Sequence, residues 1–237
     1  MNDKGLSLII PCYNEEENLQ SIFEKLKDII SKNKDIEIIL VNNGSTDNSL
    51  KVMNSLIQES IRNNIIVVNV EDNIGYGHGI LLGLKAATAN ILSWTHADMQ
   101  TDPKDILKAF HLFKTEENCI VKGRRKNRNL IDFFFTFSMQ LIVFIILKIY
   151  ITDINAQPKL FSREFYHKYL DKKSPNDFSL DLYLLLVAKK NNFKILDFPV
   201  IFSDRTKGLA KGGGSMKTKF KLILRTLKYI WNVRKII

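Results

Sequence analysis

Cysteine is scarce in this chain, which excludes several kinds of chemistry. Cys12 and Cys119 are the only cysteines among 237 residues. They stand in no paired or metal-ligand spacing, so neither a disulfide framework nor a zinc site is expected. Such a chain fits a reducing cytosol. The first apolar run, residues 6–10, is too short for the core of a secretory signal peptide, so export by that route is not expected.

Long apolar runs are also missing. The uncharged stretch 133–147 has fifteen residues, whereas a helix that crosses a membrane needs about 20. Two interpretations fit this length. The segment is either a helix lying in a membrane interface, with the basic run 122–128 just ahead of it against lipid phosphates, or a buried core helix. The pattern leaves both open.

Acidic residues are in the minority. The chain has 35 Lys and Arg against 25 Asp and Glu, a formal charge of +10, and the excess gathers in the second half. This balance favours polyanionic partners such as phosphates or an anionic membrane. The run 122–128 holds five cations in seven residues and is typical of a solvated loop. No nucleic-acid reading module is recognisable, so nucleic acid is not an expected partner.

The apolar segments indicate an α/β fold. Strands are predicted at residues 6–10, where Pro11 should close the strand, and at 36–41, 65–70 and 91–95, each followed by a helical pattern. This alternation favours a mostly parallel sheet with helices on its faces. In the second half we expect a short strand at 119–121, a polar helix from Ser162, a helix opening at 177–181 and a strand at 194–203.

Two local signals refine this expectation. Asp102 and Pro103 should cap and open a helix that runs to Lys114. The glycines at 75, 77 and 79 lack the spacing of the dinucleotide-binding fingerprint, so close helix–sheet packing is the expected role.

The segment 93–100 is the predicted chemical centre. It follows the apolar run 89–94, and ligands of open α/β sheets bind at the carboxyl ends of strands. Asp98 and Gln100 offer oxygen ligands to a divalent cation that bridges a diphosphate, and His96 faces the same side if the backbone is extended. The alternative is that Asp98 only caps the turn into the next helix.

Two basic segments follow near the carboxyl end. The loop 205–215 is rich in glycine, which would let it close over an anion with Arg205 and Lys211 supplying charge, although a plain surface linker has the same composition. Residues 216–237 interleave cations with apolar residues. This pattern predicts a basic amphipathic helix suited to an anionic membrane.

Three motifs together resemble a known family. Residues 10–15 (Ile-Pro-Cys-Tyr-Asn-Glu), 41–47 (Val-Asn-Asn-Gly-Ser-Thr-Asp) and 96–100 (His-Ala-Asp-Met-Gln) are similar, in this order, to successive motifs of family 2 glycosyltransferases. The dolichol-phosphate mannosyltransferase-like branch, which moves a sugar from a nucleotide donor to a polyprenyl phosphate, is the nearest. The resemblance implies a GT-A-type fold, with one domain at 1–215, made of a nucleotide-sugar half at 1–122 and an acceptor half at 123–215, followed by the helix 216–237.

The resemblance also implies roles for individual residues. A GDP- or UDP-linked sugar would be held with Mg²⁺ or Mn²⁺. The base and ribose would contact Pro11, Tyr13, Glu15, Val41 and Asn43; the nucleotide would run along His96 and Ala97; Asp98 and Gln100, with His96, would bind the metal; and Arg125, Arg205 and Lys211 would meet phosphates.

The chain departs from the family pattern at several positions. Asn42 and Asn43 stand where the family has two aspartates, and an amide can still form hydrogen bonds there. His96 replaces the first aspartate of Asp-x-Asp, which would favour Mn²⁺ over Mg²⁺. A serine is missing before Arg125, and Ala210 replaces another. These changes affect the expected choice of donor.

The implied reaction is an inverting transfer. The cation at Asp98 would neutralise the leaving nucleoside diphosphate, assisted by Arg205. A phosphate acceptor needs no general base, whereas a glycan hydroxyl needs one, and Asp181 is the candidate. The alternative for Asp181 is a stabilising charge at a helix start.

Two rival functions stay open at this point. One is a transferase that acts on a glycan hydroxyl in surface polysaccharide synthesis, and the other is an inactive nucleotide-binding scaffold. The expected location is the cytoplasm, peripheral on the inner face of a membrane. The oligomeric state is not predicted.

Overall fold

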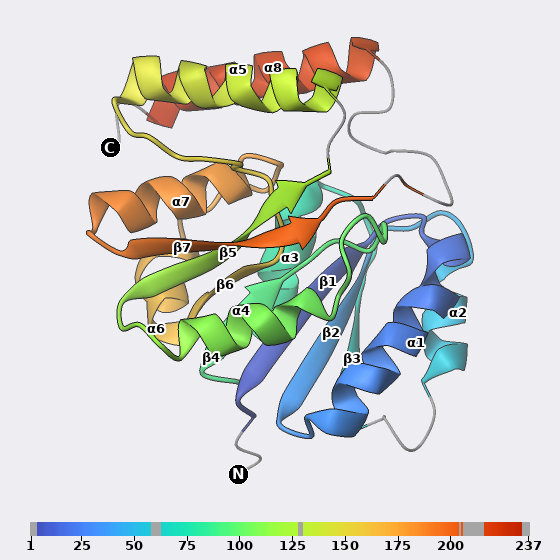
Figure 1. Cartoon of the computed structure of the whole chain (residues 1–237). Helices are drawn as coiled ribbons and strands as arrows, with labels where there is room; N and C mark the ends of the chain where they lie inside the picture. The colour runs from blue at the N-terminus through green and yellow to red at the C-terminus, as the bar shows by residue number, and fades with distance from the viewer. Residues whose placement is uncertain (1–3, 58–62, 128–129, 204, 206–215, 234–237) are drawn as a thin grey trace.

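The centre of the protein is a seven-stranded sheet (Figure 1). The computed structural model describes residues 4–57, 63–127, 130–203, 205 and 216–233. The strand order is β3-β2-β1-β4-β6-β5-β7, and all neighbours are parallel except at β6, which runs antiparallel to β4 and β5. The mostly parallel sheet is therefore confirmed. The strands are β1 (Leu6–Cys12), β2 (Ile36–Asn43), β3 (Ile65–Val70), β4 (Ile91–Trp94), β5 (Cys119–Lys126), β6 (Lys159–Ser162) and β7 (Lys194–Ile201).

Helices cover both faces of the sheet. Along β1, Leu8 and Ile10 pack into the core shared with α1 and α4, while Ile9 faces the core shared with α3 and α7. This alternation follows from the two-residue period of a strand. The helices are α1 (Glu16–Lys32), α2 (Ser49–Leu56), α3 (Tyr76–Ala86), α4 (Asp105–Phe113), α5 (Leu130–Leu147), α6 (Arg163–Phe165) with the π-helical turn η2 (Tyr166–Leu170), α7 (Leu180–Lys190) and α8 (Met216–Val233).

Parallel pairing brings the loops of the predicted motifs to one edge. β1 pairs with β2 from Leu6–Ile36 to Cys12–Asn42, and on its other side with β4. The carboxyl ends of β1, β2 and β4 therefore meet. Gly79 allows α3 to approach this edge, because a Cβ there would lie 2.7 Å from Asn43 Cγ. The packing role predicted for the glycine string is confirmed at this position.

The prediction that Pro11 closes its strand was wrong. β1 continues through Pro11, which is paired with Val41. Ile9 accepts a hydrogen bond from the backbone of Thr95 on the β4 side, and two residues later Pro11 faces the same side. Because β4 ends at Trp94, no partner there needs the N–H that proline lacks.

The prediction of a loop at the basic run was also wrong, and the strand β6 was missed. The basic run beginning at Lys122 continues β5 to Lys126 and pairs with β7 as far as Ile201, so it is not a loop over that length. Lys122 itself is buried. β6 was not predicted as a strand, because a lysine stands at its start; in the structure Lys159 is fully buried and donates a hydrogen bond to the distant Asp181.

The start of α4 differs in a smaller way. Asp102 and Pro103 form a turn before the helix, in which Asp102 Oδ1 accepts the backbone N–H of Lys104 at 3.0 Å. The helix itself begins at Asp105 and ends at Phe113.

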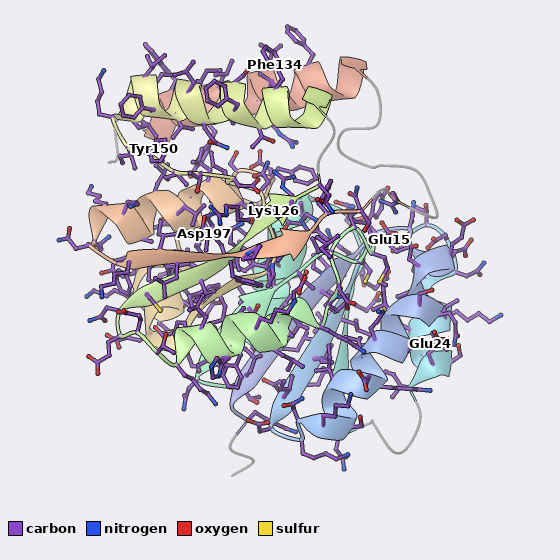
Figure 2. All side chains as sticks on the ribbon, viewed as in Figure 1. Glu15, Glu24, Lys126, Phe134, Tyr150 and Asp197 are labelled. Carbon is purple, nitrogen blue, oxygen red and sulfur yellow. The ribbon has the colours of Figure 1, made fainter. Side chains whose placement is uncertain are left out.

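The helices α5 and α8 lie side by side and form an outer layer over the sheet end (Figure 1). Val143 of α5 and Ile230 of α8 are fully buried against the core that includes α7. Phe134 of α5, by contrast, is 65% exposed and points away from the sheet (Figure 2), so α5 is not buried on all sides. Within the described residues, no helix combines the length and apolar character needed to cross a membrane.

Candidate active site

A cavity of about 670 Å³ lies where the carboxyl ends of β1, β2 and β4 meet the layer formed by α5 and α8. The strand side supplies most of the predicted residues. The helix side supplies Thr136 and Met139 from α5, and Ile223 and Arg225 from α8. The cavity therefore has a polar side built on the sheet and a side built on two helices that mixes apolar residues with a hydroxyl and a cation.

The residues after β1 form an ion pair with a distant arginine. Arg205 Nη2 donates to Glu15 Oε1 at 2.6 Å, and both side chains are largely buried. Asn18 Nδ2 also donates to Glu15, at 2.6 Å. Burial raises the pKa of the Glu15 carboxyl, and the bonds from Arg205 and Asn18 oppose this. Arg205 follows β7 and so ties the far end of the chain to the first motif.

Asn43 at the end of β2 explains why an amide suits this position. Its Nδ2 donates to the carbonyl oxygen of Gly75 at 3.0 Å, which a carboxylate cannot do. Its Oδ1 is buried and has no hydrogen-bond partner among the described residues. Asn42 points elsewhere, because its Nδ2 donates to Asn69 Oδ1 on β3 at 2.7 Å. Of the two asparagines, only Asn43 contributes to the cavity wall.

Asp98 has two oxygens with different neighbours. Oδ1 accepts the backbone N–H of Gln100 at 3.1 Å, which is the turn-capping role. Oδ2 lies 3.7 Å from His96 Nδ1. The two interpretations of Asp98 are thus compatible, since one oxygen shapes the turn and the other faces the histidine. Gln100 also lines the cavity, and its Nε2 donates to the backbone of Ser203 at 3.3 Å.

Tyr76 connects the histidine to the opposite side of the cavity. Its hydroxyl lies 3.0 Å from His96 Nε2 and accepts a hydrogen bond from Gln157 Nε2 at 3.3 Å. The same Gln157 nitrogen donates to Asp181 Oδ1 at 2.9 Å. Burial, followed by the charges of Asp181 and Asp98, raises the pKa of Tyr76 well above its ordinary value, so the hydroxyl keeps its proton.

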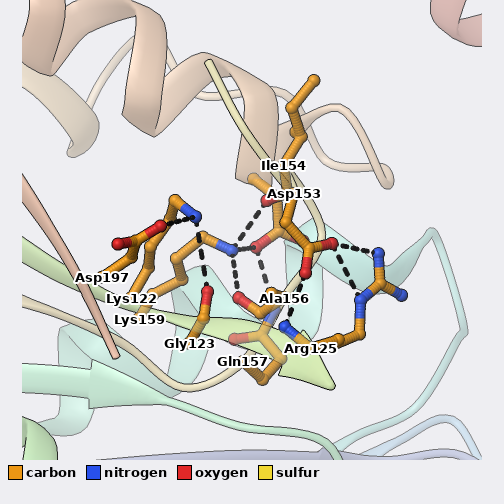
Figure 3. Close-up of polar contacts among 10 residues, drawn as sticks. Lys122, Gly123, Arg125, Asp153, Ile154, Ala156, Gln157, Lys159 and Asp197 are labelled. Carbon is orange, nitrogen blue, oxygen red and sulfur yellow. Dashed lines mark hydrogen bonds and ion pairs between the residues drawn. The ribbon is translucent and has the colours of Figure 1, made fainter. Parts of the chain in front are cut away.

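Asp181 is buried and paired with a lysine. Lys159 Nζ donates to Asp181 Oδ1 at 2.9 Å and to the carbonyl oxygens of Ile154 and Ala156 at 2.8 and 2.7 Å (Figure 3). Burial lowers the pKa of Lys159, and the Asp181 carboxylate opposes this. Since three acceptors surround the ammonium group, it is satisfied in the charged form.

Arg125 is held by a second buried carboxylate. Its Nε donates to Asp153 Oδ1 at 2.9 Å, and its backbone N–H donates to Oδ2 at 2.7 Å (Figure 3). The guanidinium also lies 5.2 Å from the centre of the Phe202 ring. Arg125 is thus fixed in orientation on the cavity wall.

A nucleophilic cysteine is not part of this site. Cys12 lines the cavity, but burial, reinforced by the charges of Glu15 and Asp47, raises the pKa of its thiol. The thiolate is the reactive form, so Cys12 is unreactive at neutral pH.

The model of the family described as Glycosyl transferase family 2 matches residues 7–174, more than half of the chain. The chain is a family 2 glycosyltransferase. A UDP-N-acetylglucosamine–dolichyl-phosphate N-acetylglucosaminyltransferase of Methanococcus voltae is 30% identical over 96% of both chains. An undecaprenyl-phosphate 4-deoxy-4-formamido-L-arabinose transferase of Proteus mirabilis is 33% identical over 52% of this chain and 37% of that protein.

Solved structures agree with the fold of this glycosyltransferase. Glucosyl-3-phosphoglycerate synthase of Mycobacterium tuberculosis, in complex with Mn²⁺, UDP and glucosyl-3-phosphoglycerate, matches with a TM-score of 0.72 and 15% identity, over 96% of this chain and 80% of that one. A mannosyltransferase of Pyrobaculum calidifontis, in complex with GDP-Man and Mn²⁺, gives 0.63 and 16%, over 98% and 70%. At these identities the likeness concerns the fold, and it confirms the GT-A-type α/β architecture.

The glycosyltransferase brings nearly all of the predicted site residues to one cavity. Val41 is an exception, because it is fully buried in β2 beside Gly83 and does not line the cavity. Lys211 lies outside the described residues. The predicted residues on the cavity wall are Pro11, Tyr13, Glu15, Asn43, His96, Ala97, Asp98, Gln100, Arg125, Asp181 and Arg205.

Several residues of this site were not predicted. Tyr76 lies inside the glycine string, whose spacing predicts only helix–sheet packing, and Gln157 and Lys159 lie in a segment without a recognised motif. Their only signal was a polar side chain next to an expected turn or apolar run, which is too common to be informative. Long-range contacts, rather than local sequence, define them.

The glycosyltransferase's residues fit a divalent cation at the His96–Asp98 pair. Two ligand atoms at about 2.1 Å from one ion lie no more than about 4.2 Å apart, and His96 Nδ1 and Asp98 Oδ2 are 3.7 Å apart. The described residues contain no group of three or more His, Cys, Asp or Glu side chains arranged around one point. A cation here would therefore need further oxygen ligands, such as substrate phosphates or water.

Proposed function

We propose that this glycosyltransferase transfers a sugar from a UDP- or GDP-linked donor to a polyprenyl phosphate, with a divalent cation and with inversion at the anomeric carbon. The observation that carries the proposal is the composition of the cavity: it brings the His96–Asp98 pair of the sheet side together with Met139, Ile223 and Arg225 from α5 and α8. The relative from Methanococcus voltae, whose name specifies UDP-N-acetylglucosamine and a dolichyl phosphate, supports it over 96% of the chain.

The donor would lie along the carboxyl ends of β1, β2 and β4. Pro11, Tyr13, Glu15 and Asn43 would contact the base and ribose, and the unpaired Oδ1 of Asn43 could accept a hydrogen bond from the nucleotide. Ala97 would lie along the nucleotide. Arg205, held by Glu15, would meet the diphosphate as a catalytic cation. Val41 would act only indirectly, through the packing of β2.

Asp98, His96 and Gln100 would hold Mg²⁺ or Mn²⁺ together with the donor diphosphate. Such a cation neutralises the negative charge of the departing nucleoside diphosphate. The imidazole ligand favours Mn²⁺ relative to Mg²⁺. The solved Mycobacterium tuberculosis enzyme was obtained with either ion together with UDP, which supports this choice by analogy.

A phosphate acceptor is preferred over a glycan hydroxyl because of the surroundings of Asp181. A hydroxyl needs a general base, but Asp181 Oδ1 already accepts hydrogen bonds from Lys159 and Gln157. These contacts favour a carboxylate that organises the wall of the cavity. An ionised phosphate needs no such base, and Arg125 and Lys211 would supply further charge for donor or acceptor phosphates.

The outer face of α5 and α8 would contact the membrane that carries the acceptor. Large apolar side chains project from it, including Phe137, Phe144 and Ile145 on α5 and Phe220 and Trp231 on α8. Cations on α8 would interact with anionic lipids. The protein would then act in the cytoplasm, peripheral on the inner face of the membrane, in cell envelope polysaccharide synthesis.

Transfer assays with purified full-length protein test the function. UDP-N-acetylglucosamine, other UDP-sugars and GDP-mannose are offered with a short polyprenyl phosphate and Mn²⁺. We expect lipid-linked product with at least one donor, its loss on chelation, and a fall of more than about 100-fold for Asp98→Asn, on the scale of a charge-stabilising group. Asp102→Asn is the matched control, because Asp102 pairs with Lys25 outside the cavity. Normal turnover after complete chelation, or in the Asp98 variant, would sink the proposal.

A further inference from the structure

Three arginines of the described part of the chain line the cavity, and they differ in how accessible their charge is. The side chains of Arg205 and Arg125 are 12% and 15% exposed, and each forms close hydrogen bonds with a buried carboxylate. Arg225 on α8 is 45% exposed, and its Nε lies 3.4 Å from Asp177 Oδ2, a carboxylate that is itself 32% exposed. Arg225 is therefore the cavity arginine that can most easily exchange its carboxylate partner for an incoming anion.

Arg225 is connected to the centre of the site by stacked rings. Its guanidinium lies 5.4 Å from the centre of the Phe178 ring. Phe178 stacks on Tyr76 at 4.8 Å with an interplanar angle of 7°, and Tyr76 contacts His96. A phosphate bound at Arg225 would thus lie on the side of these rings that faces α8, across from the donor's cation ligands.

The surroundings of Arg225 suit an amphiphile. Met139 of α5, Ile223 of α8 and Leu182 of α7 also line the cavity. A guanidinium at the edge of an apolar wall matches a molecule that has one anionic group on an apolar chain. A soluble sugar or nucleotide would gain little from this wall.

We propose that Arg225 binds the phosphate of the lipid acceptor, exchanging its partner Asp177 for it. The inference rests on the proposed function and adds a residue that none of the three motifs includes. A phosphate offers a planar guanidinium two parallel hydrogen bonds, whereas the pair with Asp177 is partly solvated and so worth little. The exchange is therefore favourable once the apolar chain lies against α5 and α8.

Calorimetry on the full chain tests this assignment. Citronellyl phosphate, citronellol and inorganic phosphate are titrated separately into protein with UDP and Mn²⁺. For the wild type we expect the lipid phosphate to bind better than both the alcohol and inorganic phosphate. For Arg225→Gln we expect roughly tenfold weaker binding of citronellyl phosphate, with the affinity for UDP unchanged. Arg225→Lys keeps the charge but loses the paired donors, so its affinity for citronellyl phosphate should lie between those of the wild type and Arg225→Gln.

Arg124→Gln is the matched control. Arg124 is 50% exposed and lies 3.9 Å from Asp197, but it does not line the cavity. It should keep the wild-type preference, and thermal unfolding of each variant checks that the fold is intact. If Arg225→Gln keeps the full preference for the lipid phosphate, or if it weakens UDP binding instead, the role of Arg225 is overturned and the proposed function is not. A wild type that does not distinguish citronellyl phosphate from citronellol overturns the proposed function with it.

Discussion

Tyr76 connects the two sides of the cavity through contacts of its hydroxyl group. Its hydroxyl contacts His96 Nε2 on one side and Gln157 on the other, and Gln157 in turn contacts Asp181. When one imidazole nitrogen is held by a hydrogen bond, the orientation and tautomer of the ring are fixed. Tyr76 therefore presents Nδ1 of His96 toward Asp98, which makes it a positioning residue.

Replacing Tyr76 by phenylalanine should weaken cation binding more than it weakens the fold. The variant keeps the stack on Phe178 but leaves His96 free to rotate, so we expect affinity for Mn²⁺, measured by EPR titration with UDP present, to fall about tenfold. Tyr183→Phe is the matched control, because its hydroxyl donates to Tyr169 O at 3.0 Å, outside the cavity wall. Equal Mn²⁺ affinity in the two variants would exclude a positioning role for Tyr76.

The sequence predicted the residues on the sheet side of the cavity better than those on its opposite side. Asp98, His96 and Glu15 follow predicted strands in recognisable motifs, so their position at the sheet edge followed from strand order. Lys159 and Gln157 act through partners more than twenty residues away, Asp181 for both. No local pattern encodes such a contact, and it becomes visible only when the antiparallel strand β6 is placed.

Among the elements, β5 is a strand although its composition is typical of a loop. Its cations suggested a loop, but β5 pairs with β7 along its whole length. Lys122 faces inward, donates to the carbonyl oxygen of Gly123 at 3.3 Å and lies 3.8 Å from Asp197 (Figure 3). Burial, and then the charge of Lys159, lower its pKa to about 8, while Asp197 opposes this.

The lowered pKa predicts a dependence of stability on pH. The unfolded chain, with Lys122 near its ordinary pKa of 10.5, binds more protons than the folded chain between pH 8 and that value. The contribution of Lys122 to the free energy of unfolding therefore rises with pH across this window. In denaturant titrations, the difference between wild type and Lys122→Met should rise by about 2 kcal/mol from pH 8 to pH 10.

An exposed lysine provides the control for this measurement. The pKa of Lys104 is raised, mainly by its hydrogen bond to Asp28, so its contribution is retained until the pH rises past its ordinary value. The difference between wild type and Lys104→Met should be level between pH 8 and pH 10. A level difference for Lys122→Met as well would mean that Lys122 is solvated in the folded protein.

At the scale of the whole molecule, the helix layer carries the exposed apolar face that we propose contacts the membrane. α5 exposes Phe134, Phe137, Leu141, Phe144 and Ile145, which recur at helical spacing and so share one face. From sequence alone the helix was equally compatible with a core position, because an apolar helix does not reveal which of its faces is covered. In the structure Val143 is buried in the core that includes α7, whereas these five side chains are exposed.

Vesicle binding tests the role of this face. Ile145 is 56% exposed, and burying an isoleucine side chain in an apolar phase contributes roughly 1.5–3 kcal/mol. Ile145→Ser should therefore reduce partition into vesicles of phosphatidylcholine and phosphatidylglycerol about tenfold in a sedimentation assay.

Ile66→Ser is the control for this prediction. It lies at a 41% exposed position on the distant edge strand β3 and should bind vesicles as the wild type does. Transfer to soluble citronellyl phosphate should stay unchanged in both variants, because neither residue lines the cavity. If Ile145→Ser partitions normally while Ile66→Ser does not, the membrane contacts the β3 edge of the molecule, and the helix layer has another partner.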